Sequence, residues 1–248
     1  MKLNKYTPLF IIILMLSACK EDVIEPQTKV VEFKETSYDF LGTFDSTGRP
    51  NYLFQPGDVI STDLISFVNK TIPEGSDLRK TNPDLLSSKG TADLTITQSS
   101  DVYITFVAQN TGSGNSVGFY TYPTNSPLKS ANDIKKITYI FPNAGSLTTL
   151  RSGDKVKIGR FEAGTSIGFV LLEASWNPAT QNLKKDVVHF CSNDILNPEV
   201  DVNLKKHAVL VNYVPEKKVL IGFEDTDRTK AICDNDFQDV VLYATVTQ

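Results

Sequence analysis

The stretch Val102-Tyr103-Ile104-Thr105-Phe106-Val107 decides the fold class of this chain. Successive residues of a β-strand point to opposite faces, and here both faces are mostly apolar. A strand of this kind is typically buried between two layers, whereas a strand of a one-sided sheet alternates apolar and polar residues. The stretch therefore favours a β-sandwich or jelly roll over a single open sheet.

Similar short runs recur along the chain, bounded by Gly, Pro, Asn or Asp and rich in β-branched residues. Strands are predicted at residues 29–34, 93–97, 102–108, 117–122, 137–141, 155–161, 167–172, 207–213, 219–223 and 240–246. Long helical periodicity is absent from the sequence. We therefore predict an all-β protein, an antiparallel β-sandwich of jelly-roll type.

Two short helices are predicted, at residues 63–70 and 82–87. In the second, Asn82 is the expected N-cap and Pro83 occupies the first helical position. Residues 73–90 are rich in polar and turn residues. We take them as the join between a small mixed N-terminal segment, residues 28–90, and the main β domain, residues 91–248.

The start of the chain has the features of an export signal. Residues 1–5 contain two lysines, residues 8–16 are all apolar, and Leu16-Ser17-Ala18-Cys19 places small residues before a cysteine. The apolar run is shorter than the roughly 20 residues of a membrane-spanning helix. Because Leu-Ser-Ala-Cys resembles the bacterial lipobox, we predict a lipoprotein signal peptide at 1–18 and lipidation of Cys19. The lipid would attach the protein to a membrane.

Residues 19–27 contain Lys20-Glu21-Asp22 and Glu25-Pro26, a composition typical of an extended tether. They resemble the acidic export tag of surface lipoproteins in Bacteroidota. The resemblance implies an outer-membrane lipoprotein that is exposed at the cell surface, and a periplasm-facing position is the alternative.

The charge and the cysteines narrow the function further. Without residues 1–18, which hold two lysines and no acidic residue, the chain has 23 basic and 29 acidic residues, a net charge of −6. Nucleic acid is therefore a poor partner.

Cys191 and Cys233 remain as an even pair in an oxidising compartment, which predicts a disulfide. Two separate buried thiols are the alternative, because the sequence gives no distance between them.

The segment from Gly222 to Asp239 carries the chemistry of the chain. It places six carboxylates in one hairpin loop between two apolar strands. Two unit charges about 4 Å apart repel by about 4 kcal/mol near a protein surface, so an ordered loop of this kind needs a compensating cation. Calcium fits, because it takes six to eight oxygen ligands in irregular geometry. The predicted ligands are Glu224, Asp225, Asp234, Asp236 and Asp239.

Further features of the sequence bear on the geometry and the identity of the predicted calcium site. Asp234 and Asp236 would point to one side of an extended segment, and Asp227 is assigned to the solvated part of the loop. The spacing is not that of an EF-hand. The alternative is a solvated acidic turn with Arg228 and Lys230 as partial counter-charges.

The same residues carry a family resemblance. Gly222-Phe223-Glu224-Asp225, followed by 234–241, is similar to the "GFED … D-x-DFND-V-V/I-F" ending of the LruC-type domain, a domain of unknown function in secreted and surface proteins. Motifs at 141–144, 150–161, 163–168 and 196–199, with His207, occur in the same order, and residues 38–61 resemble the segment that precedes the domain in Bacteroidota lipoproteins. The resemblance covers most of the chain and implies a β-sandwich, a calcium site at the acidic loop and no known reaction. Gln238 stands where the family has Asn, so no amide ligand is carried over to that position.

The remaining polar and aromatic residues have structural interpretations. His189 and His207 lack a partner nucleophile, and His207 is expected to orient the loop at 197–199. Trp176, Tyr120 and Tyr122 could form a sugar platform or cover the core. Glu224 and Asp225 are a poor glycosidase pair, because adjacent residues of a strand face opposite ways.

Together these features predict a non-enzymatic, calcium-binding lipoprotein of the cell surface with a structural or adhesive role. Its partners would be the membrane and a surface glycan or protein. A carbohydrate-binding module is the alternative and a glycan-active enzyme the third reading. An open groove lined by Trp176, Tyr120 and Tyr122 would favour the carbohydrate-binding module.

Overall fold

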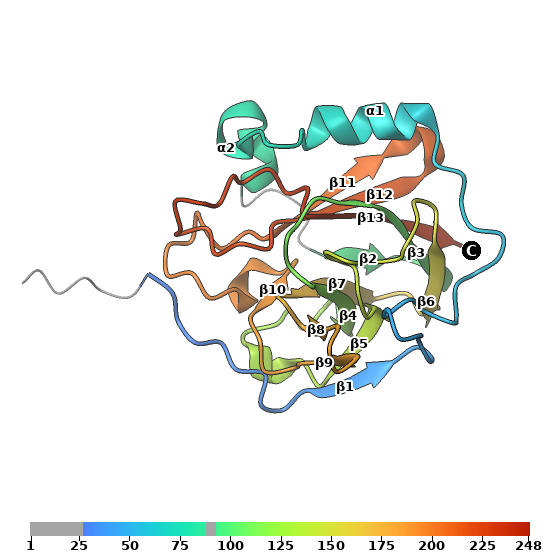
Figure 1. Ribbon diagram of the computed structural model, residues 1–248, viewed down its shortest axis with the longest axis horizontal. Coiled ribbons are helices and arrows are strands. Elements are labelled where there is room, and N and C mark those ends of the chain that lie inside the picture. Colours follow the sequence, from blue (N-terminus) through green and yellow to red (C-terminus); the bar gives the residue numbers. More distant parts are fainter. Residues whose placement is uncertain (1–26, 88–92) are drawn as a thin grey trace, which may run out of the picture.

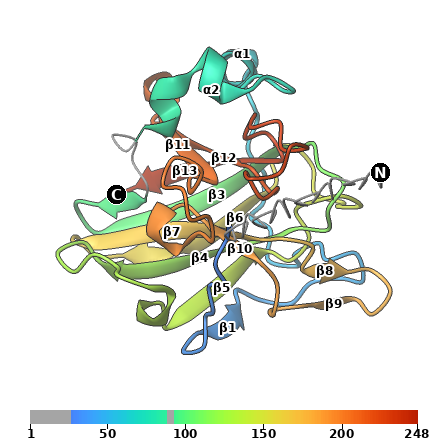
Figure 2. The ribbon, with the colours of Figure 1, turned by 90° about the vertical axis from the view of Figure 1, so that its left-hand side faces the viewer.

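Strands dominate the part of the chain that the computed structural model describes, residues 27–87 and 93–248. These residues form thirteen strands in three sheets. A six-stranded sheet and a five-stranded sheet form the two layers of a sandwich, as Figures 1 and 2 show. The predicted all-β sandwich is confirmed. The predicted signal peptide, Cys19 and almost all of the tether lie outside the described residues.

The first sheet has the strand order β1-β5-β4-β7-β10, and β2 also pairs with β7. Its strands are β1 (Ser37–Phe40), β2 (Leu94–Ile96), β4 (Ser116–Pro123), β5 (Lys136–Phe141), β7 (Thr165–Leu172) and β10 (His189–Cys191). Every pairing is antiparallel except that of β1 with β5, which is parallel. Through β1, the N-terminal segment supplies an edge strand to the sandwich.

The second sheet has the strand order β11-β12-β13-β3-β6, and all its pairings are antiparallel. Its strands are β3 (Ser100–Gln109), β6 (Lys155–Phe161), β11 (Ala208–Tyr213), β12 (Lys218–Phe223) and β13 (Val240–Thr247). A separate ribbon consists of β8 (Trp176–Asn177) and β9 (Asn182–Leu183). The last strand of the chain, β13, is therefore the central strand of its sheet.

One predicted strand, 29–34, is wrong. The structure has no strand there, and the nearest pairing is an isolated bridge between Thr28 and Glu199. The alternation of apolar residues in this run serves another purpose, because Val31 and Phe33 pack on the outer face of the first sheet. The other nine predicted strands overlap strands of the two large sheets.

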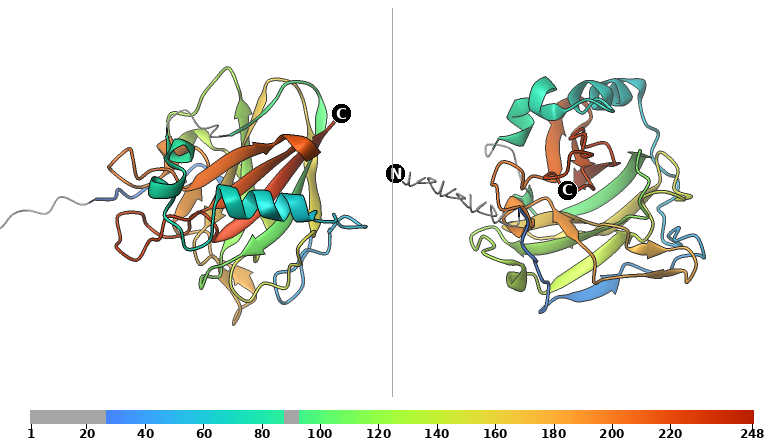
Figure 3. Two further views of the ribbon diagram at one scale, coloured as in Figure 1. Left: turned by 90° about the horizontal axis from the view of Figure 1, so that it is seen from above. Right: turned by 60° about the vertical axis from the view of Figure 1, so that its left-hand side comes forward.

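The core explains why the central stretch is apolar on both faces. Val102, Ile104 and Phe106 of β3 face the interior between the two sheets. Val107, on the opposite face, packs against helix α1 (Thr62–Thr71) and its neighbours. The second layer of apolar residues thus results from a helix that covers the outside of the second sheet, as the left view of Figure 3 shows.

Helix α1 confirms the prediction at 63–70. Its N-cap Ser61 accepts a hydrogen bond from the backbone N–H of Leu64 at 3.0 Å, and Leu64 and Val68 are buried. Two short helices follow, α2 (Leu78–Thr81), which was not predicted, and the 3-10 helix η1 (Pro83–Leu86).

The second predicted helix is thus a 3-10 turn, and Asn82 does not cap it through its side chain. Instead, Asn82 donates to the carbonyl of Thr71 at the end of α1, at 2.9 Å. The remaining 3-10 turns are η2 (Ala131–Asp133), η3 (Asp194–Leu196) and η4 (Val214–Glu216). Within residues 27–87 and 93–248, no helix has the length and apolar character needed to cross a membrane.

Candidate metal centre

The acidic loop joins β12 to β13 at one end of the second sheet. The register pairs Phe223, the last residue of β12, with Val240, the first of β13. The N–H of Asp239 also donates to the carbonyl of Phe223 at 3.1 Å. The two strand ends therefore hold Glu224 and Asp239 close to one another, although fifteen positions separate them in sequence.

The carboxylates gather in two sets of three, and Glu224 belongs to both. In the inner triad, oxygens of Glu224, Asp225 and Asp239 all lie within 4.8 Å of one another. In the outer triad, the same holds for Glu224, Asp234 and Asp236. The structure thus brings together all five residues that the sequence predicted as metal ligands.

Asp227 lies outside both triads. Its carboxylate accepts hydrogen bonds from the N–H and the hydroxyl of Thr229, at 2.9 and 2.7 Å. This arrangement is a local turn of the kind that aspartate commonly forms.

The backbone of the loop differs from the extended form that the sequence suggested. Asn235 and Phe237 have positive φ angles of 60° and 62°, so Asp234 and Asp236 converge through left-handed turns. The side chain of Asn235 holds this shape, because it donates to the carbonyl of Cys233 at 3.0 Å and accepts from Arg228 at 2.8 Å. Adjacent Glu224 and Asp225 also converge, because β12 ends at Phe223 and the strand rule no longer applies to them.

Close packing against the helical layer fixes the loop further. A Cβ at Gly222 would lie 2.5 Å from the carbonyl oxygen of Phe237 and 2.8 Å from Ile72, so only glycine fits there. The amide of Gln238 donates to the carbonyl of Ile72. Gln238 therefore attaches the loop to α1 through its amide nitrogen.

Each triad is connected to a different part of the molecule. In the inner triad, Asp225 accepts hydrogen bonds from the side chains of Thr111 and Asn115, in the loop between β3 and β4. In the outer triad, Asp236 accepts from the N–H of Gly75 at 2.7 Å, in the connection between α1 and α2.

Glu74 is a further carboxylate near Asp234 and Asp236, outside both triads, that sequence reasoning missed. Its side chain accepts a hydrogen bond from Asn110 at 2.6 Å. Because Glu74 is far from the acidic loop in sequence, no local pattern could have indicated that the two lie close together.

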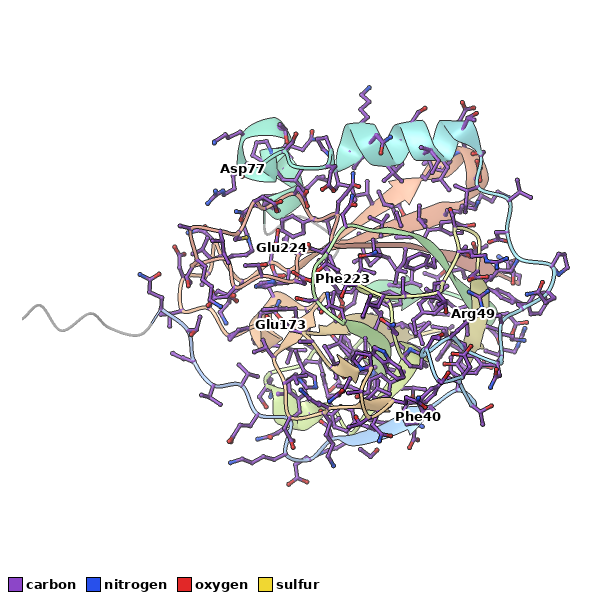
Figure 4. All side chains as sticks on the ribbon, in the orientation of Figure 1. Phe40, Arg49, Asp77, Glu173, Phe223 and Glu224 are labelled. Carbon is purple, nitrogen blue, oxygen red and sulfur yellow. The ribbon has the colours of Figure 1, made fainter. Side chains whose placement is uncertain are left out.

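Glu224, labelled beside Phe223 in Figure 4, is the least exposed of the five clustered carboxylates. Only 1% of it is exposed. One carboxylate oxygen accepts from the N–H of Thr226 at 3.3 Å, whereas the other is buried without a hydrogen-bond partner among the described residues. Within the same residues, none of the five carboxylates forms a salt bridge.

The pKa values of these carboxyl groups reflect the lack of salt bridges. Burial, and then the charge of Asp225, raises the pKa of Asp239 to about 9. Burial, and then the charge of Asp234, raises the pKa of Glu224 to about 7. The pKa values of Asp234 and Glu74 are also raised, mainly by burial. Without a cation, the centre therefore favours protonation of carboxyl groups that are ordinarily ionised.

His207 has the structural role that the sequence suggested, with different partners. Its Nδ1 donates to the backbone carbonyl of Glu224 at 2.9 Å, and its Nε2 shares a hydrogen bond with the carboxyl of Glu199 at 2.8 Å. The ring stacks on Phe190 with centroids 3.9 Å apart. His207 thus connects the 197–199 loop to the residue that both triads share.

The structure corrects the predicted disulfide, because Cys191 and Cys233 are both buried, free thiols. Cys191 lies on β10 and packs in the apolar cluster outside the first sheet. Cys233 lies in the acidic loop, where burial and the adjacent Glu224 raise its pKa. The disulfide was predicted from the even number of cysteines and the oxidising compartment. The two residues lie in different parts of the fold and do not form it.

The aromatic residues considered as a sugar platform do not form an open groove. Tyr120 and Trp176 are 1% and 4% exposed. Tyr122 is half-buried, and its hydroxyl donates to Asp93 at 2.6 Å. His189, on β10, forms a hydrogen bond with the hydroxyl of Tyr38 at 2.8 Å, and burial lowers its pKa to about 4.

A cavity of about 760 Å³ lies beside the acidic loop. Residues 28–34 and 185–190 form much of its wall, and Glu173, Asp227 and Lys230 also line it. Its volume is within the range of small-molecule sites. The cavity is separate from the two triads, since none of the five triad residues lines it.

The comparison with known families concerns the C-terminal part of the chain. Residues 161–247 match a family described as "Domain of unknown function (DUF4114)". No curated protein and no solved structure matches the chain. The matched residues begin at the end of β6 and include both halves of the acidic loop. The part of the chain that holds the five clustered carboxylates is therefore similar to a domain whose function is not known.

Proposed function

We propose that this chain is a non-enzymatic surface lipoprotein with an LruC-type domain, in which calcium at the acidic loop stabilises the β12–β13 hairpin. The observation that carries the proposal is the unpartnered, buried carboxylate oxygen of Glu224, which belongs to both triads. A buried ionised carboxylate without a partner is strongly unfavourable, so a bound cation is its natural complement. The domain would serve a structural or adhesive role.

Calcium suits the donor set better than other common metals do. The five clustered side chains offer only carboxylate oxygens, which hard cations prefer, and no histidine or thiol belongs to either triad. Calcium accepts many oxygens at irregular angles, whereas magnesium requires near-octahedral geometry and retains several waters. The converging turns of the loop favour the irregular arrangement.

The exposures of Glu224 and Asp225 support a stabilising role over catalysis. They are 1% and 4% exposed, and Asp225 already accepts hydrogen bonds from Thr111 and Asn115. A pair of catalytic carboxylates in a glycosidase must flank a sugar bond in an accessible cleft. The cavity of about 760 Å³ favours the second candidate function, a glycan-binding module, at a place other than the predicted aromatic residues.

The membrane assignment is supported by the sequence of residues 1–19. The short apolar run and Leu16-Ser17-Ala18-Cys19 fit a lipoprotein signal, and the charged residues that follow fit surface display. We expect Cys19→Ala to leave an unprocessed or soluble precursor. A Cys19→Ala variant that is matured normally and remains in the outer membrane would contradict lipid attachment.

The calcium site is tested by melting curves of the full-length protein in chelator, in millimolar calcium and in millimolar magnesium. We expect calcium to raise Tm and magnesium to substitute poorly. Asp236→Asn should abolish most of the calcium response, because it removes a buried member of the outer triad. Asp227→Asn is the matched control, since its carboxylate belongs to the same loop but to neither triad. Identical wild-type curves in calcium and chelator would show that the loop is only a charged turn.

A further inference from the structure

We propose that the acidic loop binds two calcium ions, one in each triad, and that Glu224 bridges them. The inference rests on the proposed function and goes beyond it in number, placement and linkage of the ions. Two observations carry it: the division of the carboxylates into two sets, and the buried, unpartnered oxygen of the one residue that both sets share.

The geometry argues for two ions. Calcium–oxygen distances are about 2.4 Å, so two oxygens on one ion are at most about 4.8 Å apart. The five carboxylates meet this limit as two sets of three rather than as a single set of five. Each set could surround one ion, and a carboxylate common to both has two oxygens with which to reach both.

The charges point the same way. Five carboxylates carry five negative charges when all are ionised, and one divalent cation would leave three of them uncompensated. The nearest arginine in the loop, Arg228, already donates to the side chain of Asn235 and to the carbonyl of Lys206. Two divalent cations leave a single negative charge, which suits a centre in which Glu224, Asp225 and Asp236 are buried.

The two ions would stabilise different contacts. The inner ion joins the ends of β12 and β13 and, through Asp225, the loop of Thr111 and Asn115. The outer ion joins the same hairpin to the connection between α1 and α2, where the N–H of Gly75 donates to Asp236. Calcium would thus connect the helical layer and the β3–β4 loop to one hairpin.

Stoichiometry tests the proposal directly. Native mass spectrometry and calorimetric titration of the full-length protein in detergent, with calcium alone, should give two ions per chain. Asp225→Asn should lose the inner ion and keep one, and Asp234→Asn should lose the outer ion and keep one. Asp227→Asn should keep both, and Glu224→Gln should lose both at calcium concentrations that saturate the wild type.

The outcomes separate the two proposals. A single ion in the wild type would overturn the two-ion centre while leaving calcium binding intact. Loss of all binding in Asp225→Asn and also in Asp234→Asn, with both variants folded by circular dichroism, would likewise indicate one shared site. No calcium on the wild type would refute the proposed function itself. Because the wild-type count requires no substitution, the test does not depend on the folding of any variant.

Discussion

Two carboxylate sites beside the second sheet, one half-buried at Asp58 and one largely buried in the acidic loop, differ in the groups that surround them. Asp58 accepts hydrogen bonds from Lys155, Tyr243 and Thr105 at 2.5, 2.7 and 2.8 Å. Burial alone would raise its pKa, but these donors, with Lys155 first among them, hold the pKa below its usual value. In the acidic loop, neighbouring carboxylates replace such donors, and the pKa values of Glu224 and Asp239 are raised.

The difference lies in the charges that the folded chain places beside each carboxylate. β13 contributes to both sites, through Tyr243 at the first and through its start beside Asp239 at the second. The sheet therefore has room for cationic partners, as Lys155 demonstrates, yet none of the five clustered carboxylates forms a salt bridge among the described residues. An arrangement of this kind favours a site that is completed by an ion from solution.

The largest expected effect is the calcium response of the acidic loop. A ligand that binds only the folded form stabilises it by RT ln(1 + [L]/Kd), which is about 4 kcal/mol for millimolar calcium over a micromolar site. Chelation should lower the free energy of unfolding by that amount, as measured by denaturant titration with and without calcium. Lys155→Met is the control, because the calcium increment should survive loss of the other site.

The next largest effect is the removal of the cation at Asp58. Lys155→Met leaves a mostly buried carboxylate without its charged donor, at side-chain exposures of 18% for Lys155 and 20% for Asp58. We expect a loss of about 2 kcal/mol, less than the 3–5 kcal/mol of a fully buried pair because both side chains retain some solvent. Denaturant titrations in calcium and in chelator should show the same loss. A loss that calcium restores would show that the two sites are not independent.

A smaller effect is the pH dependence of the chelated protein. Glu224 and Asp239 are ionised in the unfolded chain above about pH 4.5, whereas their folded pKa values are about 7 and about 9. The folded state therefore holds more protons across this window, and stability should fall as pH rises from 5 to 8. Asp58, with a lowered pKa, contributes the opposite trend only in more acidic solution, near and below its usual pKa of 3.8.

Melting curves from pH 5 to 8 measure this slope. Calcium should flatten it, because bound cations keep the carboxylates ionised in the folded state. A chelated protein whose Tm rises steadily over that range would contradict the arrangement of charges in the loop.

The smallest effect is expected for Asp227→Asn. Among the described residues its carboxylate accepts hydrogen bonds only from Thr229, and asparagine can accept the same hydrogen bonds. We expect a change within about 0.5 kcal/mol and an unchanged calcium increment, by the same denaturant titrations. A large loss of the calcium increment would place Asp227 among the ligands and would extend the centre toward the adjacent cavity.

The fold and the five clustered carboxylates were predictable because their signals are local. Alternation in runs such as 102–108 identifies strands, and the five carboxylates lie within sixteen consecutive positions. The parallel pairing of β1 with β5 was not predictable, since no residue in a four-residue strand encodes its partner. Glu74 was missed because it reaches the centre from the helical layer, about 150 residues earlier in the sequence.

The wrongly predicted disulfide shows the same limit of sequence patterns, because here a contact was expected and is absent. Counting cysteines says nothing about where each lies, and the structure places Cys191 among apolar side chains and Cys233 beside Glu224. In the same way, the apolar outer face of β3 gave no indication that α1 would cover it. Contacts between distant segments are decided by packing, which the pattern of a single segment does not contain.

The hydrogen bonds near the N-terminal end of the described chain have a mechanical consequence. Lys29 donates to the carbonyl of Pro198 at 2.7 Å, and Val200 donates to the carbonyl of Gln27 at 2.8 Å. Between them, Glu199 contacts His207, which in turn holds the carbonyl of Glu224. Tension applied through Gln27 would therefore be shared between the chain leading to β1 and the 197–199 loop, which His207 connects to the acidic loop. A pull from the N-terminal side would thus reach Glu224, and the proposed calcium would strengthen the loop against that pull.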